Sequence, residues 1–154
     1  MEVKTLSLFL AIIFSCRSDG EAGFQQTQEA ARVVAVQVSG DPGDYRFSVA
    51  LSTPDLGCEQ YADWWEVVSV SGELLYRRIL THSHVDEQPF TRFGGPVKIV
   101  AEEEVWVRVH MNNTGYASAA MYGSPSGGFQ MREIGDEFAA NLAQQAPLPN
   151  GCRF

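Results

Sequence analysis

The chain has 154 residues, and its 19 acidic against 11 basic residues give a formal net charge of −8 at pH 7. Proteins bind nucleic acid by neutralising phosphates with Lys and Arg, so this acidic balance excludes nucleic acid as the expected partner. The length suits one domain with an adequate hydrophobic core.

The first sixteen residues have the parts of a secretory signal. The basic residue Lys4 is followed by an apolar run over residues 6–14 and by the small residue Ser15. This run is too short to cross a bilayer as a helix, which requires roughly 20 residues. We therefore expect residues 1–15 to be a signal peptide and the remaining chain to be exported.

A cysteine directly follows this signal, in the sequence Ile13-Phe14-Ser15-Cys16. These residues resemble the lipobox of bacterial lipoproteins, which has an aliphatic residue three positions before the cysteine and a small residue directly before it. The resemblance implies cleavage before Cys16, lipidation of its thiol and a cell-envelope protein held at the membrane through the lipid anchor only. Residues 16–30 then form a flexible tether and residues 31–154 the folded domain. The alternative is an ordinary signal peptide that leaves a free secreted protein.

Cys58 and Cys152 remain as a pair if Cys16 carries lipid. Two cysteines in an oxidising compartment usually form a disulfide, and neither has the CxxC spacing of a metal thiolate site. We therefore expect a Cys58–Cys152 bridge between a mid-chain loop and the C-terminal tail. The chain-entropy model gives a crosslink over such a long loop a stabilisation of about 4–5 kcal/mol.

Alternation of apolar and polar residues with a period of two predicts about seven strands over residues 31–132. The alternation is clearest in residues 45–52 and 105–111. Ser71-Gly72 predicts a tight hairpin turn. The chain is therefore expected to be an all-β protein.

The remaining segments are expected to be loops or a single helix. Residues 53–61 and 81–96 contain Gly and Pro and are predicted to be loops. Residues 137–145 fit a short C-terminal helix with Asp136 as its N-cap. Proline residues follow and end it.

Residues 105–118, VWVRVHMNNTGYAS, resemble the sixth strand and the following loop of a fibronectin type III domain. Together with the strand count, this resemblance implies an immunoglobulin-like β-sandwich of about seven strands with a short C-terminal helix. The core tryptophan of that family's second strand is absent here. Trp64 or Trp65 on the next strand is expected to supply the core aromatic ring instead.

The three histidines of the chain lie near the ends of two predicted strands, at His82, His84 and His110. If residues 82–84 are extended, the first two imidazoles point the same way. In an immunoglobulin-like sandwich both strands finish at one pole, so the three side chains can meet there with Glu87. Imidazole suits Zn, Cu or Fe, which predicts a transition-metal site. The alternative is a set of histidines on the surface without a metal.

A second resemblance covers the same histidines. His82-x-His84-x-x-Glu87, followed by Gly94, is similar to the first cupin motif, with His110 in the place of the second motif's histidine. This resemblance implies a metal-dependent enzyme whose ligands lie inside a β-barrel.

The strand over residues 105–111 distinguishes the two folds. A core made by its valines favours the sandwich. An interior lined by Trp106, Arg108 and His110 favours the enzyme.

Four further side chains are candidates for binding, namely Trp64, Arg92, Trp106 and Arg108. Adjacent tryptophans place one indole on each face of a sheet, so Trp64 is either available for stacking on a carbohydrate or protein, or packed under the tail. Residues 91–95 are a candidate anion-binding nest around Arg92, with a plain loop as the alternative. No serine lies in a GxSxG context, and no catalytic residue is assigned.

The sequence therefore favours a non-enzymatic binding or accessory module, located in the cell envelope or secreted. Its partner is a protein or a carbohydrate. Recognition is expected at the pole formed by residues 53–63, 81–96 and 110–116, because rigid sandwiches present function on loops. The alternative is a metal-binding protein or a cupin-like metalloenzyme.

Overall fold

The structure is a computed structural model, and it describes residue 1 and residues 30–153. Residues 2–15 of the predicted signal peptide, Cys16 and residues 17–29 of the predicted tether lie outside the described residues. None of the described residues forms a helix with the length and apolar character needed to cross a bilayer.

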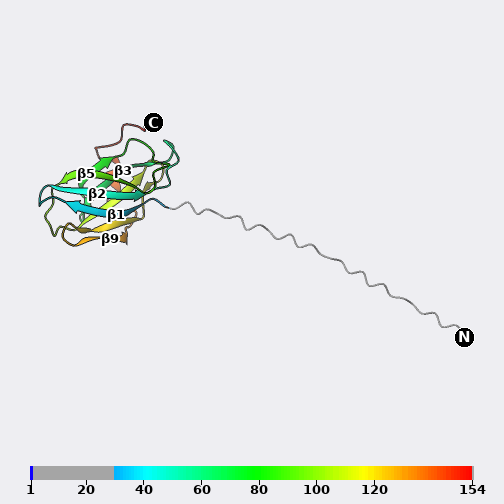
Figure 1. The fold of residues 1–154 in the computed structure, drawn as a ribbon, viewed down its shortest axis with the longest axis horizontal. Coiled ribbons are helices and arrows are strands. Elements are labelled where there is room, and N and C mark those ends of the chain that lie inside the picture. Colours follow the sequence, from blue (N-terminus) through cyan, green and yellow to red (C-terminus); the bar gives the residue numbers. More distant parts are fainter. Residues whose placement is uncertain (2–29, 154) are drawn as a thin grey trace.

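The described part of the chain contains nine strands in two antiparallel sheets (Figure 1). The smaller sheet has the order β1-β2-β5, and the larger has the order β4-β3-β6-β8-β9 with β7 paired to β6. This arrangement confirms the predicted all-β sandwich. The strands are β1 (Arg32–Ser39), β2 (Tyr45–Ser52), β3 (Ala62–Ser69), β4 (Leu74–Ile79), β5 (Phe90–Val97), β6 (Val105–Met111), β7 (Gly115–Tyr116), β8 (Ala119–Ser124) and β9 (Gly128–Glu133).

The core lies between the two sheets. Alternate residues of β2 point inward, and the same face of β3 and β6 packs against them. The core side chains from β6 are Val105, Val107 and Val109, which are fully buried. This is the arrangement expected for a sandwich. The β6 strand lies between β3 and β8, a placement compatible with the sixth strand of an immunoglobulin-like domain.

The prediction of a loop over residues 81–96 was wrong for its second half. Residues Phe90–Val97 form β5, which pairs with β2 along its length. The predicted nest over residues 91–95 is therefore replaced by strand backbone. Glycine and proline disfavour a strand in general. Here Gly94 is required, because a Cβ at this position would lie 2.5 Å from the Tyr76 ring and 2.7 Å from the Trp65 ring.

Replacement Gly94→Ala is expected to lower the free energy of unfolding by about 1–3 kcal/mol, the usual cost of overpacking a core. Two aromatic side chains would have to move to admit the methyl group. Urea unfolding followed by tryptophan fluorescence measures the change. Gly135→Ala is the matched control, because a Cβ added at this position would have no neighbouring atom within 4 Å. Equal stability of the two variants would contradict this packing.

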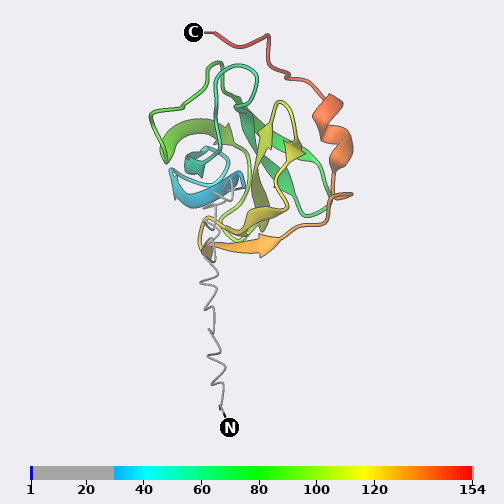
Figure 2. The same cartoon turned by 90° about the vertical axis from the view of Figure 1, so that its right-hand side faces the viewer.

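The C-terminal helix is shorter than predicted and is a 3-10 helix over Ala140–Gln144. Its N-cap is Ala139, in a left-handed conformation with φ 49°, and not the predicted Asp136. We call residues 134–153 the C-terminal strap. Figure 2 shows it in orange and red along the outer side of the larger sheet. Side chains of the sheet bind carbonyls of the strap, as described below.

Candidate functional site

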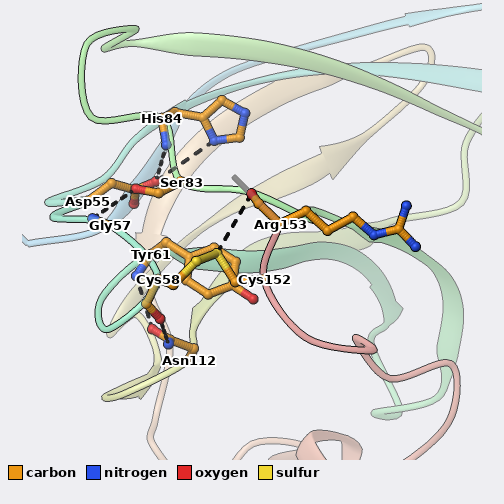
Figure 3. The surroundings of a disulfide bond; sticks show 9 residues. All are labelled: Asp55, Gly57, Cys58, Tyr61, Ser83, His84, Asn112, Cys152 and Arg153. Carbon is orange, nitrogen blue, oxygen red and sulfur yellow. Dashed lines mark hydrogen bonds and ion pairs between the residues drawn. A yellow bond between two sulfur atoms is a disulfide. The ribbon is translucent and has the colours of Figure 1, made fainter.

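Three loops meet where β2 ends and β5 begins, and the disulfide joins the strap to them (Figure 3). We call this end the loop pole; it comprises residues 53–61, 80–89 and 112–114. The Cys58–Cys152 bridge has an S–S distance of 1.98 Å and a Cα–Cα distance of 5.6 Å, which confirms the predicted pairing. Next to it, the Arg153 amide donates a hydrogen bond to the Thr81 carbonyl at 2.6 Å.

The buried Asp55 carboxylate connects the first two loops of the pole. Its Oδ1 accepts from the Ala62 amide at 3.1 Å, and its Oδ2 accepts from the His84 amide at 2.8 Å. The Ser83 hydroxyl accepts from the Gly57 amide at 3.1 Å and links the same loops again. Buried polar groups with partners on two segments fix the relative position of those segments.

Two amide side chains form further hydrogen bonds between the loops of the pole. Gln88 accepts from the Thr53 amide at 2.9 Å and donates to the Thr53 hydroxyl and to a carbonyl of its own loop. Asn112 accepts from the Tyr61 amide at 2.9 Å and donates to the Cys58 carbonyl at 3.0 Å. Each loop is thus tied to another by side-chain bonds to backbone groups, so the loop pole is a pre-organised surface.

The surface of the loop pole carries exposed apolar side chains and a cavity. Leu56 is 66% exposed and Val85 is 49% exposed. A cavity of about 390 Å³ is lined from three directions, by Pro54 and Gln60, by residues 113–118, and by Ala30 and Ala31 before β1. The N-terminal end of the domain therefore lies at the loop pole.

His110 is buried in packing on the outer face of the larger sheet. Its Nδ1 lies 2.7 Å from Asp63 Oδ1. The imidazole stacks on Trp64 with ring centroids 3.7 Å apart and meets Tyr116 edge-on at 4.8 Å. It is therefore not a solvated surface residue.

His84 is also buried, against another aspartate and another aromatic ring. Its imidazole stacks on Phe90 with centroids 3.7 Å apart, and its Nδ1 lies 3.8 Å from Asp55 Oδ2, beyond hydrogen-bond distance. Burial lowers the pKa of His84, and the positive charges of Arg92 and His82 lower it further, against the opposing effect of Asp55. The neutral imidazole is thus favoured in the folded state.

The free energy of unfolding is therefore expected to fall as the pH is lowered from about 6.5, the ordinary pKa of histidine. Between the lowered pKa of His84 and this value, unfolded chains bind more protons than folded chains. Stability is unaffected by His84 above this range and is lost as the pH falls through the folded-state pKa. His84→Gln should remove this part of the pH dependence, measured by urea unfolding at several pH values. His82→Gln, on the exposed neighbour, should keep it; identical profiles for His84→Gln and the unsubstituted chain would contradict the assignment.

The four predicted metal ligands are not gathered into one group. His82 and His84 have ring centroids 4.4 Å apart, whereas Glu87 forms an ion pair with Arg92 at 2.9 Å. Nowhere in residues 30–153 do three or more His, Cys, Asp or Glu side chains come close enough together to hold a metal ion. The two buried histidines pack against separate aspartates.

The outer face of the larger sheet is buried although it carries charged residues. Glu66 on β3 lies in register with Arg77 on β4 and with Arg108 on β6. Its two oxygens accept from their guanidinium groups, at 2.7 Å from Arg77 Nε and 2.9 Å from Arg108 Nε. All three side chains are at most 6% exposed. Trp64 is 3% exposed and lies under the guanidinium of Arg77. Of the two expected alternatives, stacking on a ligand or packing under the tail, its position fits packing under the tail.

The two guanidinium groups of this triad hold the strap. Five backbone carbonyls of the strap accept hydrogen bonds from them, which satisfies groups that a regular helix would have paired internally. Arg108 binds the carbonyls of Phe138 and Ala139, and Arg77 binds those of Leu142, Gln145 and Pro147. Arg108, named above as a candidate for binding, is thus buried and holds the strap.

Three aromatic side chains remain partly exposed at the start of the strap. Trp106 on β6 lies in register with Tyr122 on β8, and their ring centroids are 4.7 Å apart. Phe138 of the strap lies 5.9 Å from Trp106 on the other side. An open cavity of about 400 Å³ lies over them, with Arg132 and Glu133 also in its lining. We call it the Trp106 groove.

Asp55 was expected at the loop pole together with Glu59 and Asp63, whereas the sequence did not single out Gln88 and Asn112 at the loop pole or Tyr122 and Phe138 at the groove. Asp55 lies among other acidic residues of its loop, so composition does not single it out. Asn112 directly follows a strand with regular alternation. This position was a local sequence signal that its side chain could hydrogen-bond to the backbone of a loop.

The amino-acid sequence of the chain is similar to that of a known protein. The chain is 35% identical over 120 residues to a protein of Halomicrobium mukohataei that is provisionally named a lipoprotein. The match covers 77% of this chain and 54% of the relative, so the chain spans about half the length of that protein. No protein-family model matches the chain, and no solved structure matches it.

Proposed function

We propose that this chain is an exported, non-enzymatic binding module of the cell envelope that recognises a protein through its loop pole. The lipobox-like sequence that ends at Cys16 and the similarity to a protein provisionally named a lipoprotein support its place in the envelope. The strand order β4-β3-β6-β8 supports an immunoglobulin-like domain of the fibronectin type III kind.

The observation that carries the proposal is the pre-organised loop pole with its exposed apolar side chains. Asp55, Gln88, Asn112 and the disulfide fix three loops, so a partner does not have to order them on binding. Leu56 and Val85 project from this fixed frame. The buried core of a protein interface is more apolar than its polar, solvent-accessible rim, and this arrangement of side chains fits that pattern.

The position of the N-terminal end of the domain bears on where the proposed partner lies relative to the membrane. Ala30 and Ala31 lie at the loop pole. A tether attached there would keep this pole within reach of the membrane that holds the lipid. The proposed partner is therefore a protein close to the membrane surface.

Two experiments test the proposal. Leu56→Asp combined with Val85→Asp should abolish co-purification of the partner from solubilised envelopes, because charged groups replace the apolar contacts. Val100→Asp is the control, since Val100 is 57% exposed at the opposite end of the domain. Equal recovery with the double variant and the control would exclude the loop pole.

The envelope location is tested separately by Cys16→Ser. This variant should move the protein from the membrane fraction to the soluble exported fraction without changing its folded domain. A protein that stays in the membrane fraction would exclude anchoring through Cys16.

A further inference from the structure

The Trp106 groove lies at the end of the larger sheet away from the loop pole. Trp106 is near the beginning of β6, whereas the loop pole follows the end of that strand. The groove is therefore a surface separate from the loop pole. Nothing in the proposed recognition at the loop pole uses these residues.

The three aromatic rings form a concave group and not a flat platform. The Trp106 ring is inclined by 56° to Tyr122 and by 52° to Phe138. A flat sugar ring stacks best on a coplanar surface, whereas inclined rings surround a compact group. The negative faces of aromatic rings attract cations, and quaternary ammonium groups are recognised in such aromatic cages.

Charged side chains of both signs lie at the groove. The Arg132 guanidinium sits over the Tyr122 ring, 4.3 Å from its centroid, which shows that this ring already accepts a cation. Within residues 30–153, Arg132 makes no ion pair, so its donors remain available to an anion. Residue Glu133 also lines the cavity, and the Glu104 carboxylate accepts a hydrogen bond from the Tyr122 hydroxyl.

We propose that the Trp106 groove binds a zwitterion in which a quaternary ammonium group is joined to a carboxylate or a phosphate. The ammonium group lies against Trp106 and Phe138, and the anionic group binds the guanidinium of Arg132. Charge complementarity supports this assignment. The aromatic rings can hold a cation, and the guanidinium of Arg132 beside them can hold an anion. The ligand is either a free small molecule, such as glycine betaine, or a phosphocholine lipid headgroup.

Isothermal titration calorimetry of the full chain, with its disulfide intact, tests the proposal with glycine betaine, phosphocholine and choline. At least one zwitterion should bind about tenfold more tightly than choline, since a charge-assisted hydrogen bond contributes on that scale. Arg132→Met should remove this advantage and leave choline binding unchanged. Trp106→Ala should weaken all binding about fivefold, as expected for a cation–π contact at a partly exposed site.

Controls separate binding from folding. Phe93→Ala, at an exposed aromatic residue of the smaller sheet, should leave binding unchanged. Arg132 is exposed, so its variant tests the site even if Trp106→Ala fails to fold. Preference for glycine betaine would identify a free ligand, and preference for phosphocholine together with binding to phosphatidylcholine vesicles would identify a lipid headgroup.

The proposal is overturned if neither zwitterion binds at concentrations in the tens of millimolar. It is also overturned if binding of the zwitterion is unchanged in Arg132→Met, or if a neutral sugar binds where both zwitterions fail.

Discussion

Replacement Glu66→Gln is expected to lower the free energy of unfolding by about 3–5 kcal/mol, the cost of breaking a buried ion pair by removing one partner. Glu66 is fully buried and is the shared partner of Arg77 and Arg108. Glutamine keeps the shape of the side chain but leaves two buried guanidinium groups without their counter-charge. Urea unfolding at neutral pH measures the loss.

The same substitution should also loosen the strap. Its carbonyls are held by the two arginines that Glu66 orients, so hydrogen exchange of the Leu142 and Gln145 amides should speed up more than that of β2. Glu73→Gln, on the exposed β3–β4 turn, is the matched control and should change neither quantity. A loss below about 1 kcal/mol, the level of a surface ion pair, would contradict a buried triad.

Removal of the disulfide by Cys58→Ser with Cys152→Ser is expected to lower the free energy of unfolding by about 4–5 kcal/mol. The bridge joins residues 94 positions apart, so its loss greatly increases the conformational freedom of the unfolded chain. The double substitution avoids leaving one unpaired thiol. Thermal and urea unfolding of the full chain measure the effect.

The Cys16→Ser variant is the control for this comparison, because it removes a cysteine without breaking the bridge. Reduction of the unsubstituted chain should reproduce the loss seen in the double variant. A double variant as stable as the unsubstituted chain would show that the strap is held by Arg77 and Arg108 alone.

The strands with regular alternation could be predicted closely from the sequence. Residues 45–52 form β2 and residues 105–111 form β6, with the predicted bounds. These bounds could be predicted because every second side chain of each strand points into the core. The disulfide followed from cysteine number and compartment. The β5 strand was missed because Gly94 and Pro96 are typical of loops, although Gly94 is needed beside two aromatic rings.

The site could be predicted only in part, because it depends on register. Glu66, Arg77 and Arg108 become one group when β3 pairs with β4 and β6, and no local pattern fixes that alignment. A sequence signal was present in β3, whose residues ADWWEVVS do not alternate regularly between apolar and polar, as is typical of a strand covered on both faces. That signal predicts a covering segment, which is the strap.

The contacts of the histidine side chains could also be predicted only in part. The strand directions place His84 and His110 at one end of the sandwich, as predicted. Their side chains turn to different aspartates and aromatic rings, and strand order alone does not determine side-chain direction.

Site-specific photocrosslinking in intact cells tests most directly whether the loop pole is the recognition surface. A photoreactive amino acid is placed at Leu56, at Val85 or at Val100 of the full chain, all exposed positions. The proposed function predicts one protein adduct of the same mass from positions 56 and 85, and none from position 100. No adduct at positions 56 and 85, or the same adduct from position 100, would contradict it.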